Sequence, residues 1–292
     1  MIRLNITKQL QLAQGYTQLH INTIIQKNAI TAIYGSSGAG KTTLLKILAG
    51  LVQPEQGKIE VNDIPWLDTS HRFCLPAQQR SIGFVFQDYA LFPHMTVKQN
   101  LRYAAGKNGD IKYIDELLHM VKMEAFINAK PSQLSGGQQQ RIALIRALVR
   151  KPALLLLDEP LSALDDAMRR QLRTELYNIQ QQLQVTTLLV SHDIGEVYTL
   201  AANIIHLEHG QVIFQGTPQQ LFGAASLSSK LQLTGEVLRI IPNGVIYIIE
   251  VLTGSNIIRV TAGEQEIANL QVGNKVLVFA KAFNVALKKM ND

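Results

Sequence analysis

One short glycine-rich segment constrains the fold of this chain more than any other. Residues 35–42 follow the spacing G-x-x-x-x-G-K-[ST]. The apolar stretch Ala29–Tyr34 before it is typical of a strand, and residues 42–50 after it have the apolar spacing of a helix. A strand, a glycine-rich loop and a helix in this order form the phosphate-binding loop of an α/β domain.

The residue types in this loop indicate what it binds. Glycines allow a tight turn that aims backbone N–H groups inward, and the helix N-terminus adds the positive end of a dipole. We expect the Lys41 ammonium to reach the β- and γ-phosphates of a nucleoside triphosphate, and the Thr42 hydroxyl to bind Mg²⁺. The predicted nucleotide-binding residues of the loop are Gly35, Ser36, Ser37, Gly38, Ala39, Gly40, Lys41, Thr42 and Thr43.

A pair of acidic residues follows a buried strand more than a hundred positions later. Leu154–Leu157 is continuously apolar, as expected of a parallel strand covered on both faces. It carries Asp158 to the edge of the sheet, where the carboxylate can hold Mg²⁺ through water. Glu159 is then placed to polarise a water molecule for in-line attack on the γ-phosphate.

The texture of the chain divides its 292 residues into two parts. Residues 1–222 alternate short apolar strands with helical patterns, which predicts an α/β P-loop ATPase core with a helical subdomain over about 88–150. Residues 223–230 are small and form a predicted linker. Residues 231–292 are β-rich, with glycines about ten residues apart, and predict a small all-β barrel or sandwich.

Composition excludes several classes of protein. The net charge of +6 is spread along the chain without a long basic run, which favours a mildly basic soluble protein over a nucleic-acid binder. A single cysteine, Cys74, rules out an internal disulfide framework and fits a reducing compartment. The longest apolar runs are far too short to cross a bilayer, so any work at a membrane is expected to proceed through partners.

A second candidate anion cradle lies between the loop and the acidic pair. Ser135 is a good N-cap for the helical pattern that starts at residue 139, and glycines beside it allow a close backbone approach to an anion. One active site has no obvious need for two such cradles. We therefore expect two chains, each completing the site of the other through the segment Ser135, Gly136, Gly137 and Gln138.

Taken together, these motifs resemble the ATP-binding subunit of ABC transporters over residues 1 to about 222. The resemblance implies a RecA-like sheet and ATP with Mg²⁺ as cofactors, with Glu159 and His192 as catalytic residues. Gln87 matches the Q-loop glutamine, which implies that it senses Mg²⁺ and nucleotide while its segment touches a membrane partner. His192 matches the switch histidine that contacts the γ-phosphate, and Asp165 ends the D-loop match Ser162–Asp165. The implied Mg²⁺ ligands are Thr42, Gln87 and Asp158.

One feature departs from this family. An aromatic residue that stacks on adenine usually lies about 25 to 30 residues before the P-loop lysine. In that window Tyr16 is the only aromatic candidate, at its late edge, and Leu12 offers an apolar contact instead.

Finer similarities concern the transported solute. Residues 80–97 resemble importers of inorganic ions, polyamines and sugars, and residues 28–35 and 100–103 look most like the molybdate-import ATPase. The C-terminal part is similar to the OB-like oxyanion-binding domain (TOBE/Mop type) of that ATPase, in which Thr261 and Lys281 match oxyanion-contacting positions. A serine expected after the threonine is replaced by Ala262–Glu264, and the Glu264 carboxylate would repel an anion. A structural dimerisation module that binds no anion is therefore the alternative for residues 231–292.

This resemblance implies a peripheral subunit on the cytoplasmic face of the cell membrane, where hydrolysis drives uptake, with molybdate favoured over sulfate, ferric iron or polyamine. The implied partners are a second copy of the chain, two membrane permease subunits and an extracytoplasmic solute-binding protein, and no nucleic acid. A soluble ABC-type ATPase acting on nucleic acid is the alternative from another class, but such proteins usually carry long coiled coils or two ATPase cores. A P-loop kinase or GTPase would leave Leu134–Gln138 and His192 without a role.

Overall fold

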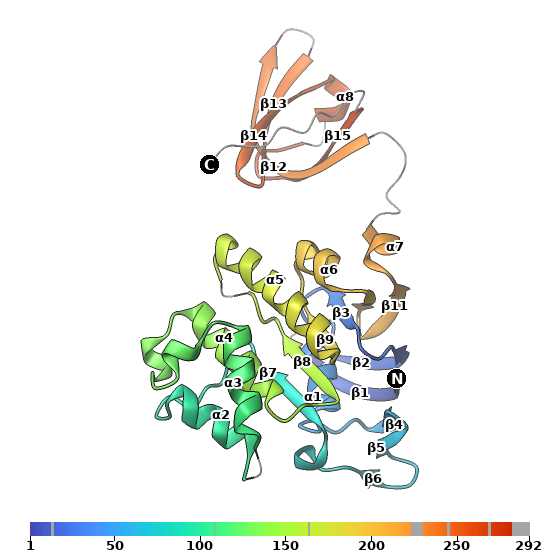
Figure 1. Ribbon diagram of the computed structural model, residues 1–292. Coiled ribbons are helices and arrows are strands. Elements are labelled where there is room, and N and C mark those ends of the chain that lie inside the picture. The colour runs from blue at the N-terminus through green and yellow to red at the C-terminus, as the bar shows by residue number, and fades with distance from the viewer. Residues whose placement is uncertain are drawn as a thin grey trace. The chain divides into compact units, whose positions relative to one another are not determined.

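The computed structural model describes residues 1–12, 15–107, 109–162, 164–222, 230–243, 246–267 and 270–281. The chain folds into two compact units, Met1–Gly223 and Ala224–Asp292 (Figure 1). The predicted linker lies outside the described residues, except Lys230, and so do residues 282–292.

A mixed sheet organises the first unit. Its strand order is β6-β5-β4-β1-β2-β11-β10-β3-β9-β8-β7, and the stretch from β10 to β7 is parallel. At the other end of the sheet, the antiparallel strands β6, β5, β4, β1 and β2 come from the N-terminal part of the chain. The strands are β1 (Ile2–Leu12), β2 (Gly15–Ile25), β3 (Ile30–Gly35), β4 (Gln56–Val61), β5 (Ile64–Asp68), β6 (Phe73–Cys74), β7 (Ile82–Val85), β8 (Leu154–Asp158), β9 (Thr186–Val190), β10 (Asn203–Glu208) and β11 (Gln211–Gly216).

Helices join these strands and gather partly beside β7. Figure 1 shows α2, α3 and α4 as a green group next to that end of the sheet, in the part of the chain for which a helical subdomain is predicted. The helices of this unit are α1 (Lys41–Leu48), α2 (Val97–Ala105), α3 (Ile111–Met120), α4 (Gly136–Leu148), α5 (Asp166–Leu183), α6 (Ile194–Leu200) and α7 (Pro218–Phe222), with short 3₁₀ turns at Ala77–Gln79, Glu124–Phe126 and Pro131–Gln133.

The core lies on both faces of the central strands. In β8, Leu155 and Leu157 pack into a cluster formed with the helices α2 to α6, whereas Leu154 and Leu156 pack into a second cluster with α1. Successive side chains of a strand point to opposite faces, so a run of four leucines fills both clusters. This confirms the prediction of a strand buried on both sides.

The second unit is an antiparallel sheet of order β14-β13-β12-β15, consistent with the predicted β-rich texture. Its buried core in the described part consists of Val237, Ile249, Val251 and Ala262. The elements are β12 (Lys230–Asn243), β13 (Ile246–Thr253), β14 (Asn256–Ala262), α8 (Glu264–Ile267) and β15 (Lys275–Lys281).

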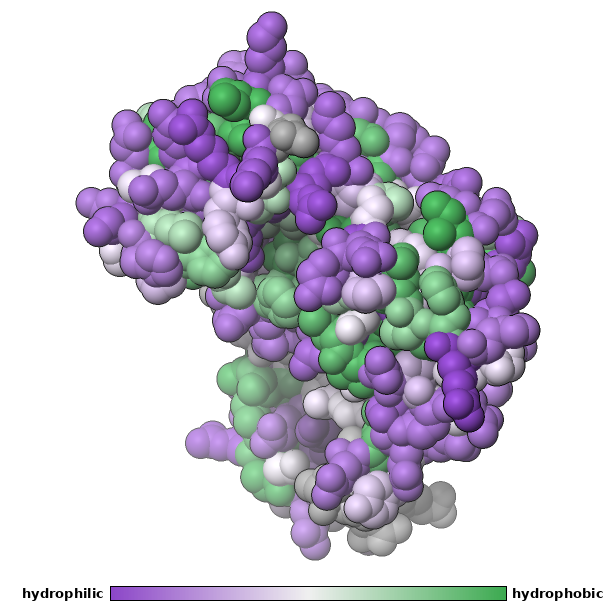
Figure 2. All heavy atoms as spheres, turned by 90° about the horizontal axis from the view of Figure 1, so that it is seen from below, coloured by the Kyte–Doolittle hydropathy of each residue, from purple (hydrophilic) through white to green (hydrophobic). Residues whose placement is uncertain are grey.

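Within the described residues, each helix is too short or too polar to cross a lipid bilayer. On the face seen in Figure 2, hydrophilic residues cover most of the outer part, and hydrophobic residues gather near the centre.

Candidate functional site

The glycine-rich loop lies between β3 and α1, as the sequence predicts. Gly35, Gly38 and Gly40 have φ values of 150°, 81° and 96°, which residues with a side chain rarely adopt. At Gly35 a Cβ atom would lie 2.1 Å from the Leu207 carbonyl oxygen on the neighbouring strand β10. Glycine at this position therefore allows both the turn and the close packing of the loop against the sheet.

Lys41 opens α1 and lies under this loop. Its Nζ donates hydrogen bonds to the carbonyl oxygens of Gly35, at 2.8 Å, and Ser36, at 2.7 Å. Burial lowers the pKa of Lys41, and the nearby carboxylates of Glu159 and Asp158 oppose that shift. The loop thus holds a desolvated ammonium group in place, ready to attract a phosphate.

Thr42 and Asp158 come from different elements and meet at the same edge of the sheet. The Thr42 hydroxyl donates to Asp158 Oδ1 over 2.9 Å. Asp158 ends β8 and is only 6% exposed, and its burial raises the pKa of the carboxyl group. A hydroxyl and a carboxylate oxygen form the kind of donor set that Mg²⁺ prefers, with water completing its shell.

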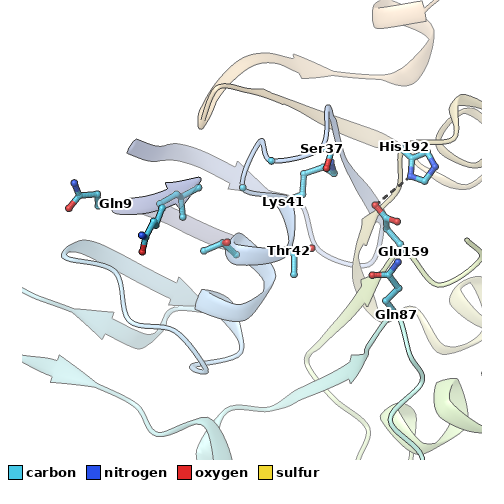
Figure 3. Close-up of a pocket in the computed structure, with 12 residues that line it drawn as sticks. Gln9, Ser37, Lys41, Thr42, Gln87, Glu159 and His192 are labelled. Carbon is cyan, nitrogen blue, oxygen red and sulfur yellow. Dashed lines mark ion pairs between the residues drawn. The ribbon is translucent and has the colours of Figure 1, made fainter. Parts of the chain in front are cut away.

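Glu159 and His192 follow the two neighbouring parallel strands β8 and β9. His192 Nδ1 lies 3.4 Å from Glu159 Oε1, and the Glu159 backbone N–H donates to the Val190 carbonyl oxygen over 3.1 Å. Glu159 has a φ of 46°, a left-handed conformation that is uncommon outside glycine. Figure 3 shows Glu159 between His192 and Gln87. Parallel strands end at the same edge, which is why two residues far apart in sequence meet here.

These groups line one open pocket of about 570 Å³. It brings together most of the predicted phosphate-contacting and catalytic residues, including Gln87 from the segment after β7. Three lining residues from the end of β1 carry no motif and were not predicted as nucleotide contacts. The complete lining is Gln9, Leu10, Gln11, Ser37, Gly38, Gly40, Lys41, Thr42, Thr43, Gln87, Glu159 and His192.

The β1–β2 hairpin borders the pocket where an adenine ring would be expected. Tyr16 pairs with Gln11 across the hairpin but is 71% exposed, and it is not among the lining residues. Leu10 lines the pocket and is 8% exposed. On this side of the pocket, the described lining residues are Leu10 and the two glutamines beside it, and the side chain of Leu12 lies outside the described part.

The second cradle is a well-capped helix start outside this pocket. Ser135 Oγ accepts from the Gln138 N–H at 3.4 Å, and Gln138 Oε1 accepts from the Ser135 N–H at 2.9 Å. These two bonds form a capping box at the start of α4. A Cβ atom at Gly137 would lie 2.7 Å from Met168 Sδ, so glycine at this position leaves room for the Met168 side chain of α5.

Asp165 caps the start of α5. Its Oδ1 accepts from the Met168 N–H over 2.8 Å. Nearby, the Ser162 hydroxyl donates to the Glu159 carbonyl oxygen over 2.9 Å and so links this segment to the residue that follows β8. Ala163, which lies between them, is outside the described residues.

The two residues matched to oxyanion contacts, Thr261 and Lys281, lie near the ends of β14 and β15. Thr261 is exposed near the end of β14, followed by the buried Ala262 and by the exposed Glu264. Lys281 ends β15, and its side chain lies outside the described residues.

Comparison with known proteins agrees with this geometry. Residues 19–162 match the family model of ABC transporters. The chain is 42% identical over 222 residues to a probable sulfate/thiosulfate import ATP-binding protein CysA of Chlorella vulgaris, covering 74% of this chain and 91% of that protein. It is 39% identical over 227 residues to the molybdenum import ATP-binding protein ModC of Pectobacterium atrosepticum, covering 78% of this chain and 63% of that protein.

A solved structure shows the same fold. The dimeric structure of MJ0796, described as a bacterial ABC transporter cassette, superimposes with a TM-score of 0.63 at 32% identity and covers 75% of this chain and 99% of that one. Together with the converging P-loop, acidic pair and histidine, these similarities establish that the chain belongs to the family of ATP-hydrolysing, ATP-binding subunits of ABC transporters.

Proposed function

We propose that this chain is the motor subunit of an ABC importer and that its solute is molybdate. Several similar relatives are molybdenum import proteins, including those of Pasteurella multocida, at 41% identity, and Escherichia coli, at 39%. The chain spans only 59% and 63% of these two proteins, so their solute is transferred here as a proposal. Sulfate is the leading alternative because the CysA relative is covered almost completely.

One observation supports an ATP sandwich made by two copies of the chain. The pocket that collects Lys41, Glu159 and His192 has no lining residue from the cap Ser135–Gln138. Ser135 and Gly136 of this cap are exposed, which fits a role in which the cap closes the nucleotide site of a second chain. The related MJ0796 cassette forms a dimer, which supports this arrangement.

The chemistry follows from the positions of the side chains. The backbone N–H groups of the loop and the Lys41 ammonium bind and orient the phosphates. Glu159, oriented by His192, accepts a proton from the attacking water at its carboxylate. Thr42, Asp158 and Gln87 would hold Mg²⁺, which when bound neutralises charge on the phosphates. We propose that the segment Ser162–Asp165 lies between the two copies of the chain, and that Asp165 stabilises it by capping α5.

Nucleotide binding can then perform mechanical work. A ligand shifts a conformational equilibrium only through its different affinity for the two states. ATP held by Lys41 of one copy and Ser135 of the other is bound fully only when the dimer is closed, so binding favours closure and hydrolysis favours reopening. We propose that this cycle drives two membrane permease subunits from the cytoplasmic face, with an extracytoplasmic solute-binding protein delivering the anion.

Mixed dimers test the shared site directly. A Ser135→Arg chain and a Lys41→Ala chain are each expected to be inactive alone. Their mixture should recover at most one intact composite site per mixed dimer, and therefore less than half of the wild-type ATP hydrolysis. Full activity of the Ser135→Arg chain alone, or no recovery of activity in a mixture that forms dimers, would show that Lys41 and Ser135 do not complete one site from two chains, and would refute the sandwich.

The solute is tested separately, by uptake. Cells that lack this chain should lose uptake of radiolabelled molybdate, and the wild-type chain should restore it while Glu159→Gln should not. Loss of sulfate uptake with molybdate uptake intact would replace the proposed solute with sulfate.

A further inference from the structure

The segment that follows Gln87 has an unusual backbone. Tyr89 and Ala90 are consecutive and have φ values of 60° and 45°. Two left-handed residues in a row are costly when neither is glycine, because the Cβ atom crowds the next carbonyl oxygen. Tight hydrogen bonds accompany them, from the Tyr89 N–H to the Phe86 carbonyl oxygen at 3.0 Å and from the Ala90 N–H to the Asp88 carbonyl oxygen at 2.7 Å. Such a conformation persists only where the surroundings hold it.

One side chain contacts both strained residues. Arg146 Nη1 donates to the Ala90 carbonyl oxygen at 2.6 Å, and Nη2 donates to the Tyr89 carbonyl oxygen at 3.0 Å. The guanidinium carbon also lies 5.8 Å from the centre of the Phe92 ring. The planar fork of arginine suits two neighbouring acceptors, and lysine cannot reproduce that geometry.

A second anchor holds the chain just beyond this turn. Asn100 of α2 is fully buried and accepts from the Phe92 N–H at 2.9 Å. Its amide group donates to the carbonyl oxygens of Phe92, Met95 and Thr96 at 3.1 to 3.2 Å. The segment is thus fixed to the helical group from residue 89 onward, and to the sheet through β7, which ends at Val85.

Gln87 lies between these two attachments and lines the nucleotide pocket. Its position is therefore set by where the helices hold Tyr89 and Ala90. We propose that Arg146 is a positioning residue that keeps this turn in its left-handed conformation and thereby places Gln87 in the nucleotide site. The inference rests on the part proposed above for Gln87 in nucleotide binding.

Helix α4 also connects the Ser135 cap with the nucleotide pocket. Arg146 lies in the last turn of α4, and Ser135 caps the other end of that helix. A helix is a stiff element that moves as a unit, and thirteen residues span about 20 Å. When a second chain engages the Ser135 end, displacement of α4 reaches the carbonyl groups of Tyr89 and Ala90 through Arg146, and so reaches Gln87.

Hydrogen exchange of the nucleotide-free full-length chain tests the clamp without any assay of activity. In Arg146→Met we expect the amides of Tyr89 and Ala90 to exchange about tenfold faster than in the wild type, because the turn opens. Arg150→Met, which removes an exposed arginine four residues further along, is the matched control and should exchange like the wild type. Arg146→Lys keeps the charge and replaces Arg146→Met if that variant does not fold; it should show the same direction of change. Unchanged exchange in the folded variant overturns the proposal.

A glycine substitution separates positioning from a general loss of structure. Glycine adopts left-handed conformations readily, so Ala90→Gly removes part of the need for the clamp. Arg146→Met should lower kcat for ATP hydrolysis about tenfold while the ATP dissociation constant changes much less, because Lys41 and the loop remain intact. Ala90→Gly should raise kcat more in the Arg146→Met background than in the wild type. The absence of this difference would show that Arg146 acts by another route. A wild-type chain without hydrolysis would instead refute the proposed function, and the exchange experiment would still decide the clamp.

Discussion

The two units of this protein differ in how deeply they bury their polar side chains. In the first unit all five residues of β8 are buried, and the strand delivers Asp158 into surroundings that exclude most water. In the second unit β14 is largely exposed, and of its residues only Ala262 is buried. Thr261, the matched oxyanion contact, therefore lies in water, where hydrogen bonds to an anion compete with hydration.

This difference in burial accounts for the difference in chemical capacity. Burial lowers the pKa of Lys41 and raises that of Asp158, so both groups are held partly out of water, where charges interact more strongly than at the surface. Among the described residues of the second unit, no polar side chain is buried to a comparable degree. Desolvated charge is thus a property of the first unit, and the following variants test that contrast.

The largest effect is expected at Glu159. Glu159→Gln should leave ATP binding intact and slow hydrolysis by roughly 10² to 10⁴, as for removal of a general base. Single-turnover kinetics with labelled ATP measure the chemical step, and Glu208→Gln, at an exposed position that ends β10, is the control. Unchanged turnover in Glu159→Gln would remove the catalytic part assigned to this carboxylate.

Next in size is the loss of the buried ammonium. Lys41→Ala should weaken ATP binding by roughly 10- to 100-fold, the amount expected for charge-assisted hydrogen bonds to phosphate. Calorimetric titration with ATP checks this, against Lys98→Ala on the exposed face of α2. If the dissociation constant stays the same, the loop is not the phosphate site.

Asp158 provides a stability test with a defined sign. Its pKa is raised in the folded state, so the group favours folding most below its unfolded pKa and loses that contribution as the pH rises through the folded pKa. Near pH 7 the buried charge therefore destabilises the nucleotide-free protein. Asp158→Asn should increase the free energy of unfolding by about 0.5 to 1 kcal/mol at pH 7, and by less near pH 4.

Urea denaturation without nucleotide at the two pH values measures this difference. Asp115→Asn, on the exposed face of α3, should change stability little at either pH. Destabilisation by Asp158→Asn at pH 7 would mean that the hydrogen bond from Thr42 outweighs the burial of the charge.

The smallest effect is expected in the second unit. Thr261→Ala should change the free energy of unfolding by less than about 0.5 kcal/mol because the side chain is exposed. If Thr261 contacts an oxyanion, the same variant should weaken molybdate binding to the full-length chain in calorimetry, relative to Ser255→Ala in the neighbouring turn. A large loss of stability would show that the second unit buries more than its described core indicates.

Much of the first unit could be predicted because its signals are local. The leucine run at 154–157 has no polar residue to expose, so it becomes a strand covered on both faces, and the spacing of the glycine-rich loop defines its turn. The N-cap at Ser135 is also a local signal, and the capping box confirms it. By contrast, Gln9, Leu10 and Gln11 carry no motif, and they line the pocket only because a hairpin folds beside the loop.

Gly137 shows that a residue in a recognised motif can have a second structural role that the motif does not indicate. The sequence indicates a glycine that permits the approach of an anion, whereas the structure shows a glycine that makes room for Met168 of α5. Contacts between elements depend on packing directions that sequence spacing does not contain.

By itself the sequence was enough to predict which residues carry the chemistry, because the glycine-rich loop, the acidic pair and the capped helix each occupy a few consecutive positions. Only the tertiary structure decided which of them share a pocket, since parallel strands bring Glu159 and His192 to one edge and leave Ser135 outside it. It also revealed the hydrogen bonds from Arg146 to Tyr89 and Ala90. Sequence spacing does not show these bonds, because Ala90 and Arg146 lie 56 residues apart and meet only when the helices pack.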